Sequence, residues 1–313
     1  MFDNTDSKFI WKNGEFQKWD DSTVHLMSHT LNYGTGAFEG VRAYKTDKGP
    51  AIFRLEDHTQ RLFDTAEKID IKIPYTKAEL NNVQKKIFVQ NNLEEGYIRP
   101  IVYLGAESLG IRALDLSVNV AVAAWEWPSY MDPQAKKKGI SIVKSSHEQY
   151  SNPLHSNNKI IGTYTNSTMA LHEALRKGAD EALLMDKNGF ISEGSGENIF
   201  IVKDGVICTP LTDHCLNGIT RQSVITIAQD QGFEVIEKNL EYVDLVEADE
   251  AFFTGTAVEI TPITKLDGKN IDSGKRGEIT HQLQSIYGDV ITGKSEKYNS
   301  WLSYADPSRD EKS

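Results

Sequence analysis

Cysteine is scarce in this sequence, with 2 residues in 313. Cys208 and Cys215 are too few for a disulfide framework, and no second pair stands nearby to complete a zinc site. Long apolar runs are also missing, because the longest, Val118–Trp127, has about half of the ~20 residues that a membrane span requires. The N-terminus has no cationic segment followed by an apolar one, as a signal peptide would have. We therefore expect a reduced, cytoplasmic protein.

Positive charge is in deficit as well. Lys and Arg number 34 against 45 Asp and Glu, which gives a formal net charge of −11. Binding to nucleic-acid phosphates or anionic lipid needs a cationic face, and the one basic run, Lys136–Lys138, has no aromatic residues interleaved with it. We expect small-molecule ligands, no nucleic acid and no membrane. A hydrophobic fraction of 39% with 25% charged residues predicts a folded core rather than disorder.

The first part of the chain reads as mixed strand and helix. Asn13-Gly14 is a strong two-residue turn signal, and it predicts a hairpin between Phe9–Trp11 and Glu15-Phe16. Apolar periodicity then predicts strands at Gly40–Tyr44, Ala51–Arg54, Tyr97–Leu104 and Val118–Ala124, and helices at Leu55–Ile69 and Lys77–Asn92.

A proline-rich stretch, Pro128–Pro133, marks a linker. Beyond it we expect strands at Ile140–Lys144, Ala182–Met185, Phe190-Ile191, Ile199–Val202, Val206–Thr209, Glu234–Ile236 and Glu250–Thr254, with helices at Thr165–Lys177, Thr220–Gln231 and Gly274–Tyr287. This order favours an α+β fold of two domains with mixed sheets over strict βαβ alternation. The expected division is a small N-terminal domain at 1–127, a linker at 128–138, a large domain at 139–304 and a polar tail at 305–313.

Three local patterns suggest sites that their context does not support. Gly288–Ser295 fits the phosphate-loop pattern, but it follows a predicted helix rather than a strand. Gly34–Gly40 narrowly misses the dinucleotide fingerprint and lacks a Rossmann first strand. His25 and His29 have metal-ligand spacing without an acidic partner, so we expect no metal site.

Four turns rich in glycine and hydroxyl residues each follow a predicted strand: Tyr33–Gly40, Ser192–Asn198, Asn217–Arg221 and Thr254–Glu259. Such turns can hold a phosphate-bearing ligand on a fixed scaffold. Thr220 begins a helix, whose amides and dipole would add to an anion site there. Each turn taken alone is equally consistent with helix capping.

Seven motifs appear in order: LNYGTGAFEGVRAY, HTQRL, YIRP, the run from Lys159 to Tyr164, ISEGSGENIF, LNGITR and GTAVEITP. Together they resemble the fold-type IV pyridoxal-phosphate enzymes and, within them, the branched-chain amino acid aminotransferases, from about Trp11 to Tyr304. The resemblance implies the two-domain class IV (D-amino acid aminotransferase-like) fold, in which a larger pseudo-barrel domain holds pyridoxal 5'-phosphate. It also implies at least a homodimer, with the segment around Gly105–Leu114 donated to the neighbouring subunit's site.

The same resemblance assigns cofactor roles. Lys159 would be the catalytic Schiff-base lysine and the proton shuttle, and Glu193 would accept the N–H of the pyridine ring. Tyr164 would bond the ring hydroxyl, and Leu216 would pack on the ring face. The phosphate would be held by Arg61, Ile219, Thr220 and Thr256. Read without the resemblance, Arg61 is a solvated helix residue and Glu193 a solvated turn residue.

Substrate roles follow in the same way. Phe38, Tyr33, Trp127 and Tyr130 would line an apolar pocket. Tyr97 with Thr256 and Ala257 would hold the substrate α-carboxylate. Arg99 and the Tyr33 hydroxyl would reach the side-chain carboxylate of glutamate, which would otherwise be buried without a partner.

The implied reaction is reversible ping-pong transamination of L-leucine, L-isoleucine or L-valine with 2-oxoglutarate. The segment Tyr150–Asn158 and the pair Ile160-Ile161 depart from the small-residue form of enterobacterial-type members, while Gly162 and Tyr164 keep the motif's spacing. Three alternatives remain: an aminotransferase for D-amino acids or (R)-amines, a nucleotide-binding protein that uses Gly288–Ser295, and an inactive relative.

Overall fold

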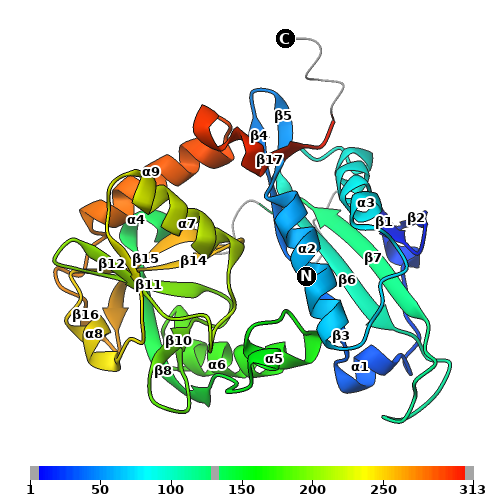
Figure 1. Cartoon of the computed structure of the whole chain (residues 1–313), viewed down its shortest axis with the longest axis horizontal. Coiled ribbons are helices and arrows are strands. Elements are labelled where there is room, and N and C mark those ends of the chain that lie inside the picture. Colours follow the sequence, from blue (N-terminus) through cyan, green and yellow to red (C-terminus); the bar gives the residue numbers. More distant parts are fainter. Residues whose placement is uncertain (1–6, 128–133, 307–313) are drawn as a thin grey trace. The chain divides into compact units, whose positions relative to one another are not determined.

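The computed structural model describes residues 7–127 and 134–306, which form two compact units. Unit 1 comprises Met1–Pro128, Asn158–Gly162 and Asp289–Ser313, and unit 2 comprises Ser129–Asn157 and Thr163–Gly288. Both units contain helices and strands (Figure 1), which confirms the α+β class. The short segment that carries Lys159 and the chain beyond residue 288 group with unit 1, although the sequence placed them in the expected large domain.

Unit 1 is built on an eight-stranded sheet in the order β17-β5-β4-β6-β7-β1-β2, with β3 paired to β6. Every pairing among its described strands is antiparallel, so the expectation of a mixed sheet is wrong for this unit. Its strands are β1 (Phe9–Lys12), β2 (Glu15–Lys18), β3 (Gly36–Phe38), β4 (Val41–Thr46), β5 (Gly49–Phe53), β6 (Gly96–Leu104), β7 (Val118–Trp125) and β17 (Leu302–Tyr304).

The predicted hairpin between β1 and β2 is confirmed. Trp11 pairs with Phe16, and both turn residues have positive φ, 50° at Asn13 and 102° at Gly14, as a tight two-residue turn requires. The unit's helices are η1 (Trp19–Asp21), α1 (His29–Tyr33), α2 (Leu55–Lys68), α3 (Lys77–Gln90) and η3 (Glu296–Trp301).

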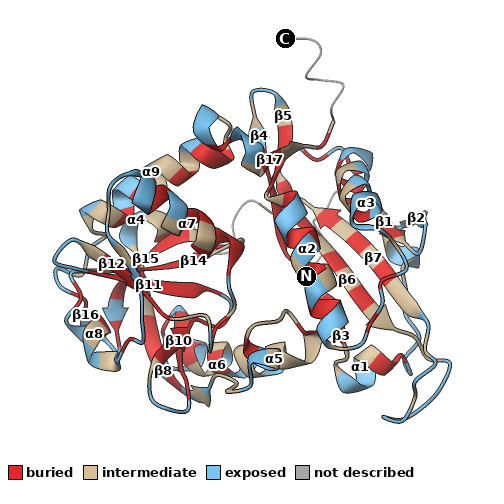
Figure 2. Cartoon of the chain, in the orientation of Figure 1, coloured by how far each residue is buried: buried red, intermediate tan, exposed pale blue. Residues whose placement is uncertain are grey.

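Helices α2 and α3 match the predicted helices to within two residues, and both contribute to the apolar core that covers the sheet (Figure 1). A capping box between Thr76 and Glu79 starts α3. Buried and half-buried residues alternate along β6 and β7 (Figure 2), as expected for a sheet with one face on the core.

Unit 2 is built on a nine-stranded sheet in the order β10-β9-β8-β15-β14-β11-β12-β13, with β16 paired to β15. This sheet is mixed, because β8 pairs in parallel with both β9 and β15 while β14 and β11 are antiparallel. Its strands are β8 (Ile140–Glu148), β9 (Glu181–Met185), β10 (Ile191–Glu193), β11 (Asn198–Lys203), β12 (Val206–Thr209), β13 (Val235–Glu237), β14 (Glu250–Gly255), β15 (Glu259–Leu266) and β16 (Lys269–Asn270).

The helices of the remaining chain are α4 (Ala135–Lys138), α5 (Pro153–Ser156), η2 (Ile161–Thr163), α6 (Tyr164–Arg176), α7 (Ile219–Asp230), α8 (Tyr242–Val246) and α9 (Glu278–Ile291). Helix α6 connects β8 to β9, and Ala170 and Ala174 on it pack with Val143 and Leu184 in a small core of their own. No helix within 7–127 and 134–306 is long and apolar enough to cross a membrane.

The sequence missed β15, a strand that lies between β8 and β14. Pro262 stands in it opposite Phe252, and proline is ordinarily excluded from interior strands. A register shift between Ile263 and Lys265 accompanies this proline. The last helix begins at Glu278 rather than at the expected Gly274, and it runs to Ile291. Gly288 is therefore helical and opens no phosphate loop.

Gly34 joins α1 to the Lys159 segment. It ends α1 with a φ of 72°, and its carbonyl accepts a hydrogen bond from the Gly162 N–H (3.0 Å). A Cβ at position 34 would lie 2.6 Å from the Gly162 Cα, which is backbone and has little room to move. Only glycine satisfies both the backbone conformation and this approach.

We expect Gly34→Ala to lower the free energy of unfolding by about 2 kcal/mol or more, because a left-handed alanine costs about 1 kcal/mol and the steric overlap adds to it. Gly14→Ala is the matched control, since Gly14 also has positive φ but its Cβ would meet only the Tyr75 hydroxyl at 3.9 Å. Urea unfolding of both variants measures the difference. Equal losses in the two variants would contradict the close approach at Gly34.

Candidate functional site

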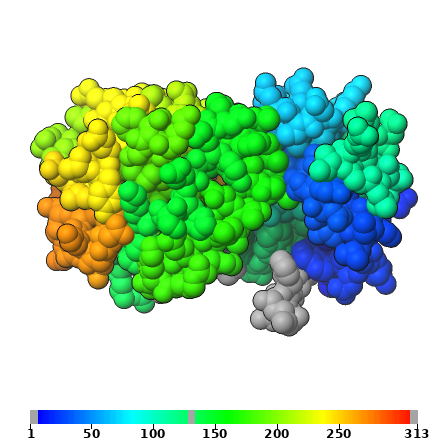
Figure 3. Space-filling view, turned by 90° about the horizontal axis from the view of Figure 1, so that it is seen from below, coloured from blue at the N-terminus to red at the C-terminus, as the bar shows by residue number. Residues whose placement is uncertain are grey.

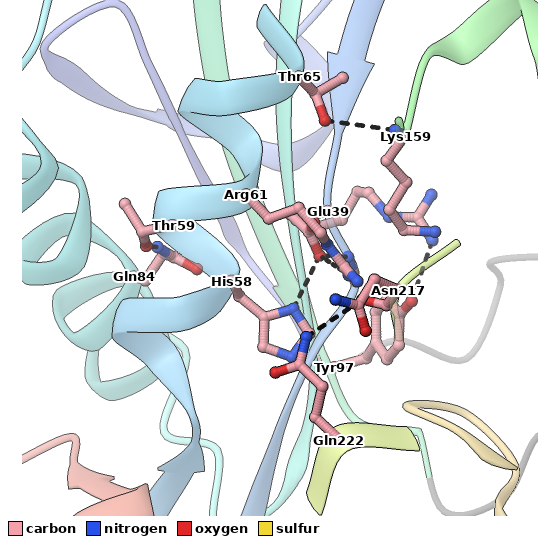
Figure 4. A network of polar contacts seen from close by, with 12 residues as sticks. Glu39, His58, Thr59, Arg61, Thr65, Gln84, Tyr97, Lys159, Asn217 and Gln222 are labelled. Atoms are coloured by element: carbon pink, nitrogen blue, oxygen red, sulfur yellow. Dashed lines mark hydrogen bonds and ion pairs between the residues drawn. The ribbon is translucent and has the colours of Figure 1, made fainter. Parts of the chain in front are cut away.

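The backbone around Lys159 is tied to two elements of unit 1. The Phe38 N–H donates to the Lys159 carbonyl (3.2 Å), and the Lys159 N–H donates to Thr65 Oγ1 (3.3 Å) on α2 (Figure 4). An antiparallel bridge between Ala37 and Ile160 extends the first contact. Lys159 is thus held by β3 and α2, and both elements lie far from it in the sequence.

Aromatic and cationic side chains gather beside Lys159. Its Nζ lies 4.5 Å from the centre of the Phe38 ring, and the Arg99 Cζ lies 5.0 Å from the same ring. The Arg99 guanidinium contacts the Tyr97 hydroxyl (3.4 Å), and the Tyr97 ring meets Trp127 edge-on at 4.8 Å. Five residues assigned by resemblance are therefore brought together within unit 1.

Arg99 has an unmet hydrogen-bonding group. Its Nε is buried and has no partner among the residues that the structure describes. A buried donor without a partner is costly, and such donors in a cluster of this kind suit an anionic ligand.

Arg61 is neither solvated nor loosely held. Its Nε donates to Glu39 Oε1 (2.6 Å) and its Nη2 donates to Glu39 Oε2 (2.9 Å), which is a bidentate pair (Figure 4). His58, one turn before Arg61 on α2, reaches the same carboxylate, with Nδ1 at 2.7 Å from Oε2. The Glu39 side chain is 0% exposed and that of Arg61 is 16% exposed.

The ionisation of this group follows from its partners. Burial alone would raise the pKa of Glu39, but the Arg61 guanidinium and His58 outweigh it and hold that pKa far below its usual range. Burial lowers the pKa of His58 despite the Glu39 carboxylate, and the positive charges of Arg61 and Lys159 act in the same direction. At neutral pH we assign an ionised Glu39, a charged Arg61 and a neutral His58 that donates its Nδ1–H to Glu39.

In unit 2, Glu193 ends β10 and is buried, so the interpretation as a solvated turn residue is wrong. One carboxylate oxygen accepts a hydrogen bond from the Gln149 side chain. The other accepts the Leu216 N–H (3.2 Å) and lies 3.5 Å from Asn198 Nδ2. Three separate chain segments therefore fix its orientation.

Asn198 joins three of the turns that the sequence singled out. It begins β11 opposite Thr254 of β14, which places the turn after β14 beside it. Its Nδ2 donates to the Leu216 carbonyl (2.8 Å), and a Cβ at Gly218 would lie 2.0 Å from its Oδ1. The turns at 192–198, 217–221 and 254–259 therefore meet at one end of the unit 2 sheet.

The start of α7 has the features of an anion site. Its N-cap is Gly218, and no side chain caps it within the described part of the chain. Thr220 is buried in its first turn. Because α7 has 12 residues, its N-terminal amides carry the positive end of a substantial helix dipole.

The remaining assigned residues are placed as follows. Tyr33 lies on α1, is 47% exposed and packs against His29 with ring centres 4.6 Å apart. Tyr164 starts α6, and Thr256 and Ala257 lie in the turn between β14 and β15. Tyr130 lies outside the described residues. The described parts of the chain hold no group of three or more His, Cys, Asp or Glu side chains arranged to bind a metal.

Four contributors were missed from the sequence: Glu39, His58, Gln149 and Asn198. Glu39 and Asn198 stand inside the quoted motifs, but nothing in the sequence indicates which side chain each would meet. His58 and Arg61 are three residues apart, and this helical spacing is a signal that they share one face.

Comparison with known proteins agrees with this geometry. The model of the amino-transferase class IV family matches residues 36–266. A branched-chain-amino-acid aminotransferase of Pseudomonas aeruginosa is 49% identical over 293 residues, which cover 93% of this chain and 95% of that protein.

Solved structures of similar proteins share the fold. One, a branched-chain amino acid aminotransferase of T.th. with pyridoxamine 5'-phosphate, superposes with a TM-score of 0.93 at 41% identity, covering 96% of this chain and 99% of the other. Another, the branched-chain aminotransferase of the thermophilic archaeon Thermoproteus uzoniensis with norvaline, gives a TM-score of 0.91 at 39% identity, covering 96% of this chain and 100% of the other.

The chain belongs to the class IV aminotransferases, a family that uses pyridoxal phosphate, and it has their two-domain α+β fold. It is an enzyme of this family, and its similarity to branched-chain-amino-acid aminotransferases extends over nearly its whole length.

Asn198→Ala should lower the free energy of unfolding by about 1–3 kcal/mol, because it leaves the Leu216 carbonyl without its donor and empties space beside Gly218. Denaturant unfolding of the cofactor-free protein measures this. Asn166→Ala is the matched control, since Asn166 donates one exposed hydrogen bond to the Glu148 carbonyl (2.9 Å) and should cost less than about 1 kcal/mol. A loss at Asn198 no larger than at Asn166 would show that the three turns are held by other contacts.

Proposed function

We propose that this enzyme transfers the amino group of L-leucine, L-isoleucine or L-valine reversibly to 2-oxoglutarate, by a ping-pong mechanism with pyridoxal 5'-phosphate as cofactor. The observation that carries the proposal is the cluster around Lys159: an amine on a fixed backbone, beside the Phe38 ring, with the Arg99 guanidinium at the same ring. The names of the similar proteins support the substrate class.

The residues present fit a phosphate-bearing cofactor. The uncapped start of α7 offers amides and the Thr220 hydroxyl, and Gly218 lets the backbone approach closely. In this proposal Ile219, Thr220 and Thr256 of unit 2 and Arg61 of unit 1 bind the phosphate, Tyr164 bonds the ring hydroxyl and Leu216 packs on the ring. Pyridoxal phosphate, when bound, serves as the electron sink for the carbanion that forms at the substrate Cα.

Lys159 binds the cofactor covalently in this proposal and, once displaced by an amino acid, moves the proton at the substrate Cα. Thr65 and Phe38 fix the main chain of Lys159, so the amine moves only by rotation of its own side chain. Glu193 accepts the N–H of the cofactor ring. Its two oxygens are held by Gln149 and Leu216, which prevents the carboxylate from turning away.

The substrate residues combine apolar walls with one cation. Phe38, Tyr33, Trp127 and Tyr130 would contact a branched side chain, and Tyr97, Thr256 and Ala257 would hold the α-carboxylate. Arg99, with the Tyr33 hydroxyl, would bind the side-chain carboxylate of glutamate. The buried Nε of Arg99 supports this role, because it is a donor without a partner in the described residues.

A homodimer is part of the proposal. Leu109, Ile111 and Leu114 are 66%, 82% and 92% exposed on the segment between β6 and β7, which lies at the surface of unit 1 (teal-green in Figure 3). Exposed apolar side chains grouped in this way favour burial against another chain. The expected cytoplasmic location also stays a proposal, supported by Cys208 and Cys215 being unpaired.

Borohydride reduction of the purified enzyme with pyridoxal phosphate should leave a phosphopyridoxyl adduct on Lys159, located by peptide mass mapping. Lys159→Ala should form no adduct there and should lose transamination by roughly 10³-fold, since both the covalent link and the proton shuttle are removed. Lys48→Ala, at an exposed turn lysine, is the control and should behave as wild type. An adduct on another lysine, or full activity of Lys159→Ala, would contradict the assignment.

Arg99→Gln should raise the KM for 2-oxoglutarate by about 10- to 100-fold, since a hydrogen bond to a charged group contributes about 1.5–3 kcal/mol. The half-reaction with L-leucine should change much less, because its side chain carries no charge. Stopped-flow measurement of the two half-reactions separates them. Arg99→Lys, which keeps the charge but not the paired donors, should lie between. Equal losses in both half-reactions would assign Arg99 to a feature common to all substrates.

A further inference from the structure

Glu39 is a buried carboxylate that the proposed function leaves without a role. It stands between β3 and β4, and its N–H donates to the Pro100 carbonyl (2.9 Å), so its backbone is fixed by the sheet. Its side chain accepts hydrogen bonds from Arg61, His58 and the Gly40 N–H (3.2 Å) (Figure 4). None of its surface is exposed.

We propose that Glu39 is a positioning residue that aims the Arg61 guanidinium at the cofactor phosphate, with His58 as a second brace on the same carboxylate. This inference rests on the proposed function, because it takes Arg61 as a phosphate ligand. It adds that the affinity for the phosphate depends on a carboxylate that does not touch it.

The geometry of the guanidinium makes this possible. A guanidinium has five N–H groups, and pairs of them form parallel edges that fit a carboxylate or a phosphate. Glu39 takes the edge made by Nε and one Nη2 hydrogen. The edge made by Nη1 and the second Nη2 hydrogen points the other way and matches two oxygens of a phosphate. Holding one edge therefore fixes the direction of the other.

The helix alone does not give this direction. Arginine has a long side chain with many rotamers, and ordering such a chain costs up to about 2 kcal/mol. Glu39 meets this cost before any ligand arrives, because the pair exists in the structure without a cofactor. His58 occupies the remaining side of Glu39 Oε2 at 2.7 Å, so the carboxylate has no room to swing.

The electrostatic effect of Glu39 has the opposite sign, which makes the inference testable. A carboxylate near Arg61 reduces the attraction of that site for a dianion. If Glu39 acted only through its charge, its neutralisation would strengthen phosphate binding. If Glu39 acts by positioning, Glu39→Gln should weaken it, because an amide presents N–H groups to donors that need acceptors.

The test compares pyridoxal phosphate with pyridoxal, which lacks the phosphate. Absorbance titration of the cofactor-free protein gives the Kd for each. We expect Glu39→Gln to raise the Kd for pyridoxal phosphate by about tenfold or more, the size of one charge-assisted hydrogen bond. The Kd for pyridoxal should change by less than about threefold, since Arg61 contributes little without a phosphate. Glu39→Asp, which keeps the charge but sets it back, should lie between.

Arg61→Gln provides the background that isolates the mechanism. In that background, adding Glu39→Gln should have no further effect on the ratio of the two Kd values, because Glu39 would have no guanidinium to aim. An equal rise for both ligands would assign Glu39 a structural role, and an unchanged or lower Kd for pyridoxal phosphate would overturn the inference. If wild type forms the Lys159 adduct while Glu39→Gln keeps the wild-type ratio, only this inference fails and the proposed function stands. If Arg61→Gln keeps the wild-type ratio, the phosphate role of Arg61 fails, and this inference fails with it.

Discussion

A charge in a protein interior must have a partner, and this requirement governs unit 1. Glu39 is wholly buried, and its ionised form persists because Arg61 and His58 compensate the loss of water. Both partners come from one face of α2, whose start and length are set by its amphipathic sequence. The same helix supplies Thr65, which receives the Lys159 N–H. The packing of α2 on the sheet therefore determines the position of the Arg61 guanidinium and of the Lys159 main chain together.

Unit 2 meets the same requirement with amides and hydroxyls instead of ions. Asn198 ties two turns by side-chain contacts and a third by its pairing with Thr254. Glu193, the one carboxylate assigned a role there, is held by an amide side chain and a main-chain N–H. Neutral partners leave this carboxylate with its full charge, which suits a group that must keep a ring nitrogen protonated. Glu39, by contrast, is neutralised by its partners and suits a structural brace.

Local sequence signals predicted most of the elements. Asn13-Gly14 predicted the first hairpin, and the apolar periodicity of α2, α3 and α6 predicted those helices to within two residues. Prediction failed where long-range contacts override local preference. Pro262 lies in a strand because β8 and β14 flank it on both sides, and the antiparallel order of unit 1 depends on which strands meet. The segment of Lys159 groups with unit 1 through contacts to Phe38 and Thr65, which no composition shift reveals.

The site was predictable in its residues but not in its connections. The motifs singled out Lys159, Arg61 and Glu193, yet the partners that orient Arg61 and Glu193 are distant in sequence or carry ordinary spacing. A crystal structure of the chain with pyridoxal phosphate is the most direct test. The account predicts continuous density from Lys159 Nζ to the cofactor, the phosphate within about 3.2 Å of Arg61, and Glu39 still paired to the other edge of the guanidinium. A cofactor joined to a different lysine, or an Arg61 turned away from the phosphate, would contradict it.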